Sequence, residues 1–247
     1  MKLLFNIALL LFSTSILAQE SLYSIPIDSI EKNKQYIPTG IRVGVDILGP
    51  ILHQFDKRKL SYELTLDTDI DKYGLVVEAG YQQFNEVNDN VDYAMKGTFL
   101  RIGPEANFLH MSKDLNNFFF GLRYAWSSFD ETIVGTVEDD IWGSIPVDFD
   151  VKNNTSRWFE MNTGLRIRLW KGLFTGYTLR FRFGRGGSVP DVPFSPYYIP
   201  GYGLAQYKST WDFRYYVLYR IQWSKKPILS KRKEEKKKSQ VNKESEN

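Results

Sequence analysis

The alternation of apolar and polar side chains over residues 211–223 constrains the fold more than any other feature of this chain. The stretch reads WDFRYYVLYRIQW, with an apolar or aromatic residue at every odd position and Asp212 and Arg214 among the even ones. Period two indicates a β-strand whose faces meet different surroundings. Twelve rises of ~3.3 Å, tilted by ~45°, stand ~28 Å tall, close to the apolar band of an outer-membrane barrel. The stretch therefore predicts the closing strand of a transmembrane β-barrel.

Seven further segments alternate in the same way, which gives an even number of strands, as in bacterial barrels. These segments are 41–48, 60–67, 73–81, 98–106, 118–129, 159–169 and 173–183. We expect an all-β fold with about eight antiparallel strands, over residues 40–224. The connections alternate between external loops (49–59, 84–95, 130–156 and 185–209) and shorter periplasmic turns (68–72, 107–117 and 171–172). This order predicts that both termini lie in the periplasm.

The two ends of the chain differ in composition from the barrel. Residues 1–18 combine Lys2, an apolar run and Ala18, which predicts a secretory signal peptide. Residues 19–39 are expected to form a periplasmic lead-in. Residues 225–247 are charged and of low complexity, which predicts a disordered tail. This tail is basic and accounts for the chain's net charge of +3, so a nucleic-acid partner is not expected.

The polar face of the predicted strands carries charges of both signs. We call these residues the lumen charge network: Arg42, Asp46, Glu63, Glu78, Arg101, Glu105, Arg123, Glu160, Arg166, Arg168, Arg180, Arg182, Asp212, Arg214 and Arg220. Asp67 shares this face. An eight-stranded barrel is just wide enough for side chains to fill, and a lone buried ion is very costly. We therefore expect arginine–carboxylate pairs that plug the lumen, and outward apolar residues that contact lipid.

A secreted, lipocalin-like barrel is the rival fold, because it would place the apolar face inside around a ligand. The charged face of this chain also carries the glycines, which suits a narrow, crowded interior and favours the membrane barrel. Four aromatic residues of the closing strand are expected to form a girdle at the membrane interfaces: Trp211, Trp223, Tyr215 and Tyr219.

Three segments outside the predicted strands are candidates for binding an envelope protein. Loop 185–209 contains Phe194, Tyr197, Tyr198 and Tyr202, and either folds over the barrel mouth or forms a docking surface. Loop 130–156 is acidic, and either is simply solvated or bridges to lipopolysaccharide through divalent cations. The tail 225–247 either contacts peptidoglycan or a partner subunit, or only solubilises the chain.

Catalysis and metal binding have weak support in the sequence. His53 lies near Asp56 and Ser61, which leaves open a lipid-modifying or proteolytic enzyme with a histidine at the rim. Asp67, with Asp69, Asp71 and Glu78, has the spacing of an EF-hand loop, but Lys72 stands where that loop needs glycine. We assign no catalytic residue, cofactor or metal.

Two segments share an Arg-x-Gly-x-acid pattern: IPTGIRVGVD at 37–46 and FLRIGPE at 99–105. They resemble strands of an uncharacterised family of small outer-membrane barrels from Bacteroidota, and the resemblance covers most of residues 36–224. It implies a barrel in the outer membrane of a Gram-negative bacterium. Proteins of this kind include accessory subunits of barrel-assembly or secretion complexes, so it also implies a non-enzymatic scaffold or accessory role.

Overall fold

The computed structural model describes residues 38–223, apart from residues 71, 89, 111, 113, 140–142 and 189–195. The predicted signal peptide, most of the lead-in and the tail lie outside this part of the chain. No helix in it is long and apolar enough to cross a membrane.

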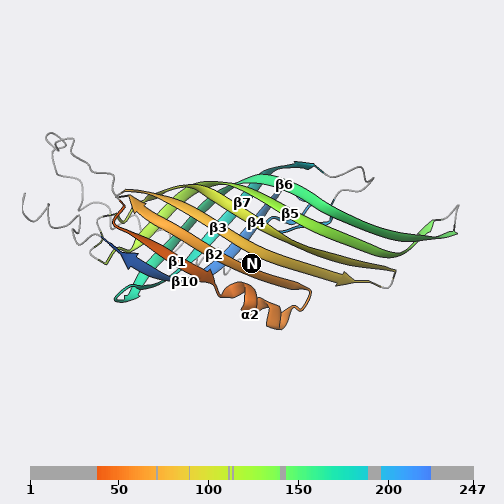
Figure 1. Cartoon of the computed structure of the whole chain (residues 1–247), viewed down its shortest axis with the longest axis horizontal. Coiled ribbons are helices and arrows are strands. Elements are labelled where there is room, and N and C mark those ends of the chain that lie inside the picture. The colour runs from red at the N-terminus through yellow and green to blue at the C-terminus, as the bar shows by residue number, and fades with distance from the viewer. Residues whose placement is uncertain are drawn as a thin grey trace, which may run out of the picture. The chain divides into compact units, whose positions relative to one another are not determined.

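Eight strands close into an antiparallel barrel in the order β1-β10-β7-β6-β5-β4-β3-β2 (Figure 1). They are β1 Gly40–Asp46, β2 Lys59–Ile70, β3 Tyr73–Val87, β4 Val91–Asn107, β5 Asn117–Asp139, β6 Gly143–Trp170, β7 Leu173–Ser188 and β10 Ser209–Gln222. Outside the barrel sheet, the described chain forms a helix, α2 Leu48–Phe55, and a short ribbon of β8 Tyr198–Ile199 and β9 Gly203–Leu204. The predicted all-β, eight-stranded antiparallel barrel is confirmed.

The register of the strands sets their tilt. From Val45, the row of paired residues runs through β2, β3, β4 and β5 to Arg157 of β6. In the other direction it runs through β10 and β7 to Ile167 of the same strand. A stagger of ten residues therefore accumulates around the barrel. Over eight strands spaced ~4.8 Å apart, this stagger corresponds to a tilt of ~40°.

We call the end of the barrel that holds Gly40 and Gln222 the terminal end, and the opposite end the hairpin end. The connections at the hairpin end differ from the prediction. The β3–β4 and β5–β6 hairpins continue as paired strands through most of residues 84–95 and 130–156, which were expected to be loops. Phe84, Met95 and Glu131 stay buried on the inner face where these segments leave the barrel, whereas residues nearer the tips, such as Val87 and Ile145, are exposed. The backbone pairing continues through both regions.

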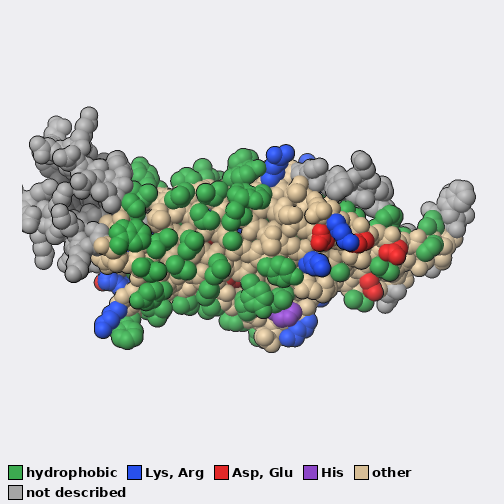
Figure 2. All heavy atoms as spheres, in the orientation of Figure 1, with side chains coloured by type: hydrophobic (Ala, Val, Ile, Leu, Met, Phe, Trp, Pro, Cys, Tyr) green, Lys and Arg blue, Asp and Glu red, His purple; other side chains and the backbone are tan. Residues whose placement is uncertain are grey.

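The two faces of the barrel wall are chemically opposite. Tyr219 is 61% exposed on the outside, whereas Arg101 and Arg180 are fully buried inside. All eight barrel strands carry exposed apolar side chains, which we call the apolar belt. On the face shown in Figure 2 they cover the terminal part of the barrel, and charged side chains appear beyond them toward the hairpin end. On β6 the apolar belt runs from Phe159 to Leu169, ten rises that stand ~25 Å tall at this tilt.

Helix α2 replaces the second half of β1, in a segment that was expected to be a loop. The last paired residues of β1 are Val45 with β2 and Asp46 with β10. Beyond them, residues 59–63 of β2 and 209–215 of β10 have no strand between them in the described chain. We call this gap the seam. Helix α2 lies along it and contacts both strands, so a helix completes the wall at this height (Figure 1).

Three contacts hold α2 in the seam. The Asp46 carboxylate accepts hydrogen bonds from the backbone N–H groups of Leu48 (3.1 Å) and Gly49 (3.0 Å) at the start of the helix. Gly49 packs so closely that a methyl group there would overlap the carbonyl oxygen of Ser61. His53 Nδ1 lies 2.9 Å from the carbonyl oxygen of Lys59 on the free edge of β2. Asp46 thus satisfies N–H groups at the start of the helix, and His53 satisfies a carbonyl on the edge of β2, groups that an apolar environment would otherwise penalise.

Candidate functional site: a charged lumen beneath a plug

Fourteen of the fifteen predicted residues of the lumen charge network point into the barrel, and Asp67 joins them. Arg168 is the fifteenth. It is half-buried at the terminal end and pairs with Phe174, whose side chain is buried on the inner face, and its Nε donates to the carbonyl oxygen of Asp114 (3.2 Å). The pairing of β6 with β7 shifts register after this residue, between Arg168 and Trp170, so the regular inward alternation ends at Arg168.

At the terminal end the network begins with Arg42, whose Nε lies 2.5 Å from Asp67 Oδ1. The other oxygen of Asp67 is 3.6 Å from Arg166 Nε, and Arg166 Nη2 donates to Glu105 Oε2 (3.1 Å). Arg220 lies at the same end and donates to the hydroxyl of Thr39 (2.6 Å). Each charge therefore has a polar partner on a different strand or at the strand end.

Acidic and basic side chains from six strands meet at the centre of the lumen. Arg101 contacts Glu63 through Nη1 and Glu160 through Nε, both at 2.9 Å. Arg180 contacts Glu63 as well, and also Glu78 at 2.9 Å. Arg123 links Glu78 to Glu105, so the central group joins the terminal one. Charges of both signs interleave across the barrel, which is the arrangement that keeps buried ions compensated.

Toward the hairpin end the network reaches the seam. Arg182 contacts both Glu160 (3.6 Å) and Asp212, and Arg214 contacts Asp212 and Asp46, each at 2.8 Å. Asp46 is also the residue whose carboxylate accepts from the start of α2. The ion pairs therefore form one connected set from Arg42 at the terminal end to the helix in the wall.

Residues 196–207, which we call the plug, fold into the barrel mouth above this network. Ile199 and Tyr202 are fully buried, and Tyr198 stacks on Phe84 with ring centroids 4.3 Å apart. Trp158 packs edge-on against Tyr202 at 5.6 Å. The plug and the inward apolar residues of β3, β4, β5 and β6 make up the larger of the apolar clusters in the described chain.

Hydrogen bonds tie the plug to the charges beneath it. The carbonyl oxygen of Gly201 accepts from Arg101 Nη2 (3.0 Å), and that of Tyr202 accepts from Arg182 Nη1 (2.8 Å). Gly201 has φ +78°, and a Cβ there would come within 2.7 Å of the Phe99 ring. Glycine is therefore required both by the backbone and by the close approach.

The burial of the plug corrects the predicted docking loop. Tyr198 and Tyr202 lie inside the mouth and present no surface to a partner, because their rings fill space that water would otherwise occupy. Tyr197 is 43% exposed, and Phe194 lies outside the described residues. Of the two alternatives left open by the sequence, the loop folded over the barrel mouth is the one observed.

A carboxylate beyond the apolar belt holds the outer edge of the plug. Glu131 of β5 accepts hydrogen bonds from the hydroxyl of Tyr93, from the backbone N–H of Tyr197 (3.2 Å) and from Asn154 Nδ2 (2.9 Å). Burial raises the pKa of the Glu131 carboxyl above its ordinary value, and the three donors oppose this rise. Alternation could not reveal this contact, because Glu131 falls in a segment that lacks it.

The candidate catalytic residues do not assemble into a triad. His53 is bound to the backbone of Lys59, and Ser61 points into the lumen, where its hydroxyl accepts from Arg214 Nη1 (3.3 Å). Asp56 pairs with Arg58, whose hydrogen bond lowers the pKa of the Asp56 carboxyl.

Two of the four acids in the segment that resembles an EF-hand loop are paired with arginines. Asp67 contacts Arg42, and Glu78 contacts Arg123 and Arg180, all inside the barrel. No cluster of acidic or histidine side chains able to hold a metal ion occurs in the described chain.

Three of the four predicted girdle residues lie near the edges of the apolar belt. Trp211 is 73% exposed at one edge, and Trp223 and Tyr219 are exposed near the other. Tyr215 is half-buried and pairs with Tyr177 midway between those edges. Trp170, 69% exposed beside the turn at 171–172, was missed. Trp223 was predicted because it is a tryptophan at the end of a strand, and Trp170 meets the same criterion.

The fold is similar to that of small barrels with low sequence identity. Neisserial surface protein A matches with 11% identity and a TM-score of 0.40, over 74% of this chain and 96% of that one. Ail, the attachment invasion locus protein of Yersinia pestis, matches with 8% identity and a TM-score of 0.38, over 74% and 97%. CarO of Acinetobacter baumannii matches with 15% identity and a TM-score of 0.36, over 76% and 99%.

No curated protein matches. A family model described as a domain of unknown function, DUF6048, matches residues 1–226, and the chain belongs to that family.

Proposed function

We propose that this barrel spans the outer membrane of a Gram-negative bacterium, with both termini in the periplasm, and acts as a non-enzymatic scaffold or accessory subunit of an envelope complex. One observation carries the membrane placement: a ~25 Å belt of apolar side chains surrounds a lumen of paired ions. In water this arrangement would expose the apolar face and bury the charges. The resemblance of residues 37–46 and 99–105 to barrels from Bacteroidota supports the same placement.

The contents of the lumen support a structural role over transport or catalysis. The ions from Arg42 to Asp46 contact one another, and the plug covers them at the hairpin end. Side chains that must stay paired leave little freedom for a permeating ion. His53, the only histidine proposed for an enzymatic alternative, supports the docking of α2 to Lys59.

Surfaces for a partner remain on both sides of the membrane. The β5–β6 hairpin extends beyond the apolar belt and carries exposed acids, including Asp148 and Asp150. The tail 225–247 is basic and would lie in the periplasm. With Tyr198 and Tyr202 buried in the plug, we assign docking to the hairpin within 130–156, to the tail, or to both.

Purification in a mild detergent tests this proposal. Full-length protein carrying an affinity tag should retain stoichiometric envelope proteins, and deletion of residues 225–247 or truncation of the hairpin at 134–148 should release them. A chain with Lys171→Gln, which changes a charge at a terminal-end turn, serves as the control. Recovery of a lone monomer under conditions that preserve other envelope complexes would contradict an accessory role.

A further inference from the structure

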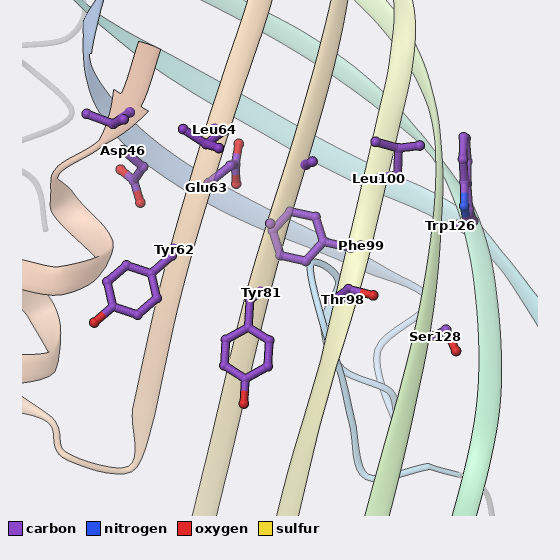
Figure 3. A pocket seen from close by; sticks show the side chains of 13 residues that line it. Asp46, Tyr62, Glu63, Leu64, Tyr81, Thr98, Phe99, Leu100, Trp126 and Ser128 are labelled. Carbon is purple, nitrogen blue, oxygen red and sulfur yellow. The ribbon is translucent and has the colours of Figure 1, made fainter. Parts of the chain in front are cut away.

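A groove of about 640 Å³ crosses the outward face of the barrel from β1 to β5 (Figure 3). Its lower wall is one row of paired residues, Val45, Leu64, Ala79, Leu100 and Trp126. The side chain of Ala79 is short, so the row is recessed at its centre. The surface of the apolar belt is therefore not even here but contains a depression.

The next row toward the hairpin end forms the upper wall. It consists of Tyr62, Tyr81, Thr98 and Ser128, which are likewise paired across β2 to β5. Figure 3 shows the rings of Tyr62 and Tyr81 on neighbouring strands beside the groove. The polar character of this wall rises along its length, from the tyrosines to the hydroxyls of Thr98 and Ser128. Asp46, Glu63 and Phe99 also line the groove, but their side chains are buried on the inner side of the wall. The outward side chains are apolar at the Val45 end and more polar at the Ser128 end.

The groove has the length of an acyl chain and runs obliquely across the apolar belt. Four interstrand steps of ~4.8 Å make it ~19 Å long, which suits one long acyl chain. Because rows of paired residues run perpendicular to strands tilted by ~40°, the groove climbs ~12 Å toward the hairpin end between Val45 and Trp126. An acyl chain that follows it would start near the outer edge of the apolar belt and end near the middle.

The end of the groove nearest the hairpin end of the barrel carries a cationic side chain. Arg157 of β6 is the direct partner of Trp126 in the sheet, and its side chain is exposed on the outward face. Within the described chain no carboxylate forms an ion pair with it. A register shift in the pairing of β6 with β7 lies between Arg157 and Phe159, at the edge of the belt, where a bulge re-aims side chains. Guanidinium groups bind phosphate through two parallel hydrogen bonds.

We propose that this groove binds a phosphorylated lipid of the outer leaflet, with one acyl chain between the two rows and a phosphate on Arg157. The proposal rests on the placement of the barrel in the outer membrane, and it goes beyond the scaffold role. Charge complementarity selects this occupant: the apolar groove accepts any acyl chain, whereas the arginine at its outer end distinguishes a phosphorylated headgroup from a neutral one.

Lipid binding to the purified, folded barrel tests the proposal. Native mass spectrometry in detergent would compare the full chain with diphosphorylated lipid A and with the same lipid after removal of its phosphates. Two variants address the two parts of the site: Ala79→Phe fills the groove, and Arg157→Gln removes the charge. Their matched controls are Ala106→Phe, on the outward face of β4 near the terminal end, and Lys171→Gln.

We expect Arg157→Gln to weaken the binding of lipid A about tenfold, the loss of one charge-assisted contact. Dephosphorylated lipid should bind the unaltered chain as weakly as lipid A binds this variant. Ala79→Phe should weaken both lipids, and the two controls should leave both unchanged. Equal binding of the two lipids, or equal losses in variants and controls that remain folded by heat modifiability, would overturn the proposal. The readout does not depend on any protein partner, so it is independent of the scaffold role.

Discussion

Gly49 is the residue on which the docking of α2 depends most directly. A methyl group at this position would overlap the carbonyl oxygen of Ser61, a backbone atom that cannot move aside without disturbing β2. We expect Gly49→Ala to lower the free energy of unfolding by about 1–3 kcal/mol, as overpacking does. Urea unfolding in detergent would measure it. Gly186→Ala is the control, because nothing lies within 4 Å of the added carbon. Equal stability of the two variants would refute the close packing of α2.

Glu160 lies among three arginines at the centre of the lumen. It contacts Arg101 at 2.9 Å, Arg182 at 3.6 Å and Arg180 at 4.0 Å. Glu160→Gln leaves these arginines under-compensated, so we expect a loss of about 3–5 kcal/mol. The surface pair of Asp150 with Lys152 gives the comparison, since Asp150→Asn should cost about 0–1 kcal/mol. Unfolding midpoints that do not separate the two variants would argue against a buried network.

The direction of each side chain was predictable from alternation, because period two assigns every residue of a strand to one face. The same rule placed Glu63 and Arg214 inside correctly. It does not show how a residue at the rim is partnered: Arg168 pairs with the buried Phe174, but its Nε donates to the backbone of Asp114. Which carboxylate pairs with which arginine was not predictable, since partners such as Arg180 and Glu63 lie on strands that meet only across the lumen.

Among the elements, α2 was missed although its sequence carries two signals. Pro50 lies in the first turn, where its missing N–H leaves no bond unmade. Leu48, Ile51, Leu52 and Phe55 follow helical spacing. The segment is only eight residues long and directly follows a strand, so it was assigned to the loop expected between two strands. Its position in the wall depends on β1 ending early, which the sequence does not show.

The plug could not be assigned from composition, because buried and exposed aromatic loops have the same residue types.

The role of the plug can be separated from that of the ion pairs beneath it. Replacing residues 197–206 with a short glycine linker should leave the lumen closed, because the ion pairs from Arg42 to Asp46 remain. Recordings in planar bilayers are expected to stay at baseline. Discrete conductance steps would show that the plug is the principal barrier and that the network leaves a path.

At the scale of the whole molecule, the apolar belt sets where charge is tolerated. Val217 lies on the outward face of β10, near the middle of the belt. We expect Val217→Arg to destabilise the barrel folded in lipid by about 2–4 kcal/mol. Val134→Arg makes the same exchange on β5 beyond the belt and should be nearly neutral. The fraction of heat-modifiable protein after refolding into vesicles reports the difference, and an unaffected Val217→Arg yield would contradict this placement of the belt.

The most direct measurement is an accessibility scan of β10 in lipid vesicles. The chain contains no cysteine, so single cysteines at positions 212 to 221 can each carry one spin label. Labels at odd positions should collide with oxygen dissolved in the bilayer, and labels at even positions should be shielded from it. The opposite phase, with odd positions enclosed and even ones facing the surroundings, would mean a barrel that carries its apolar face inside, and would contradict an apolar belt in contact with lipid.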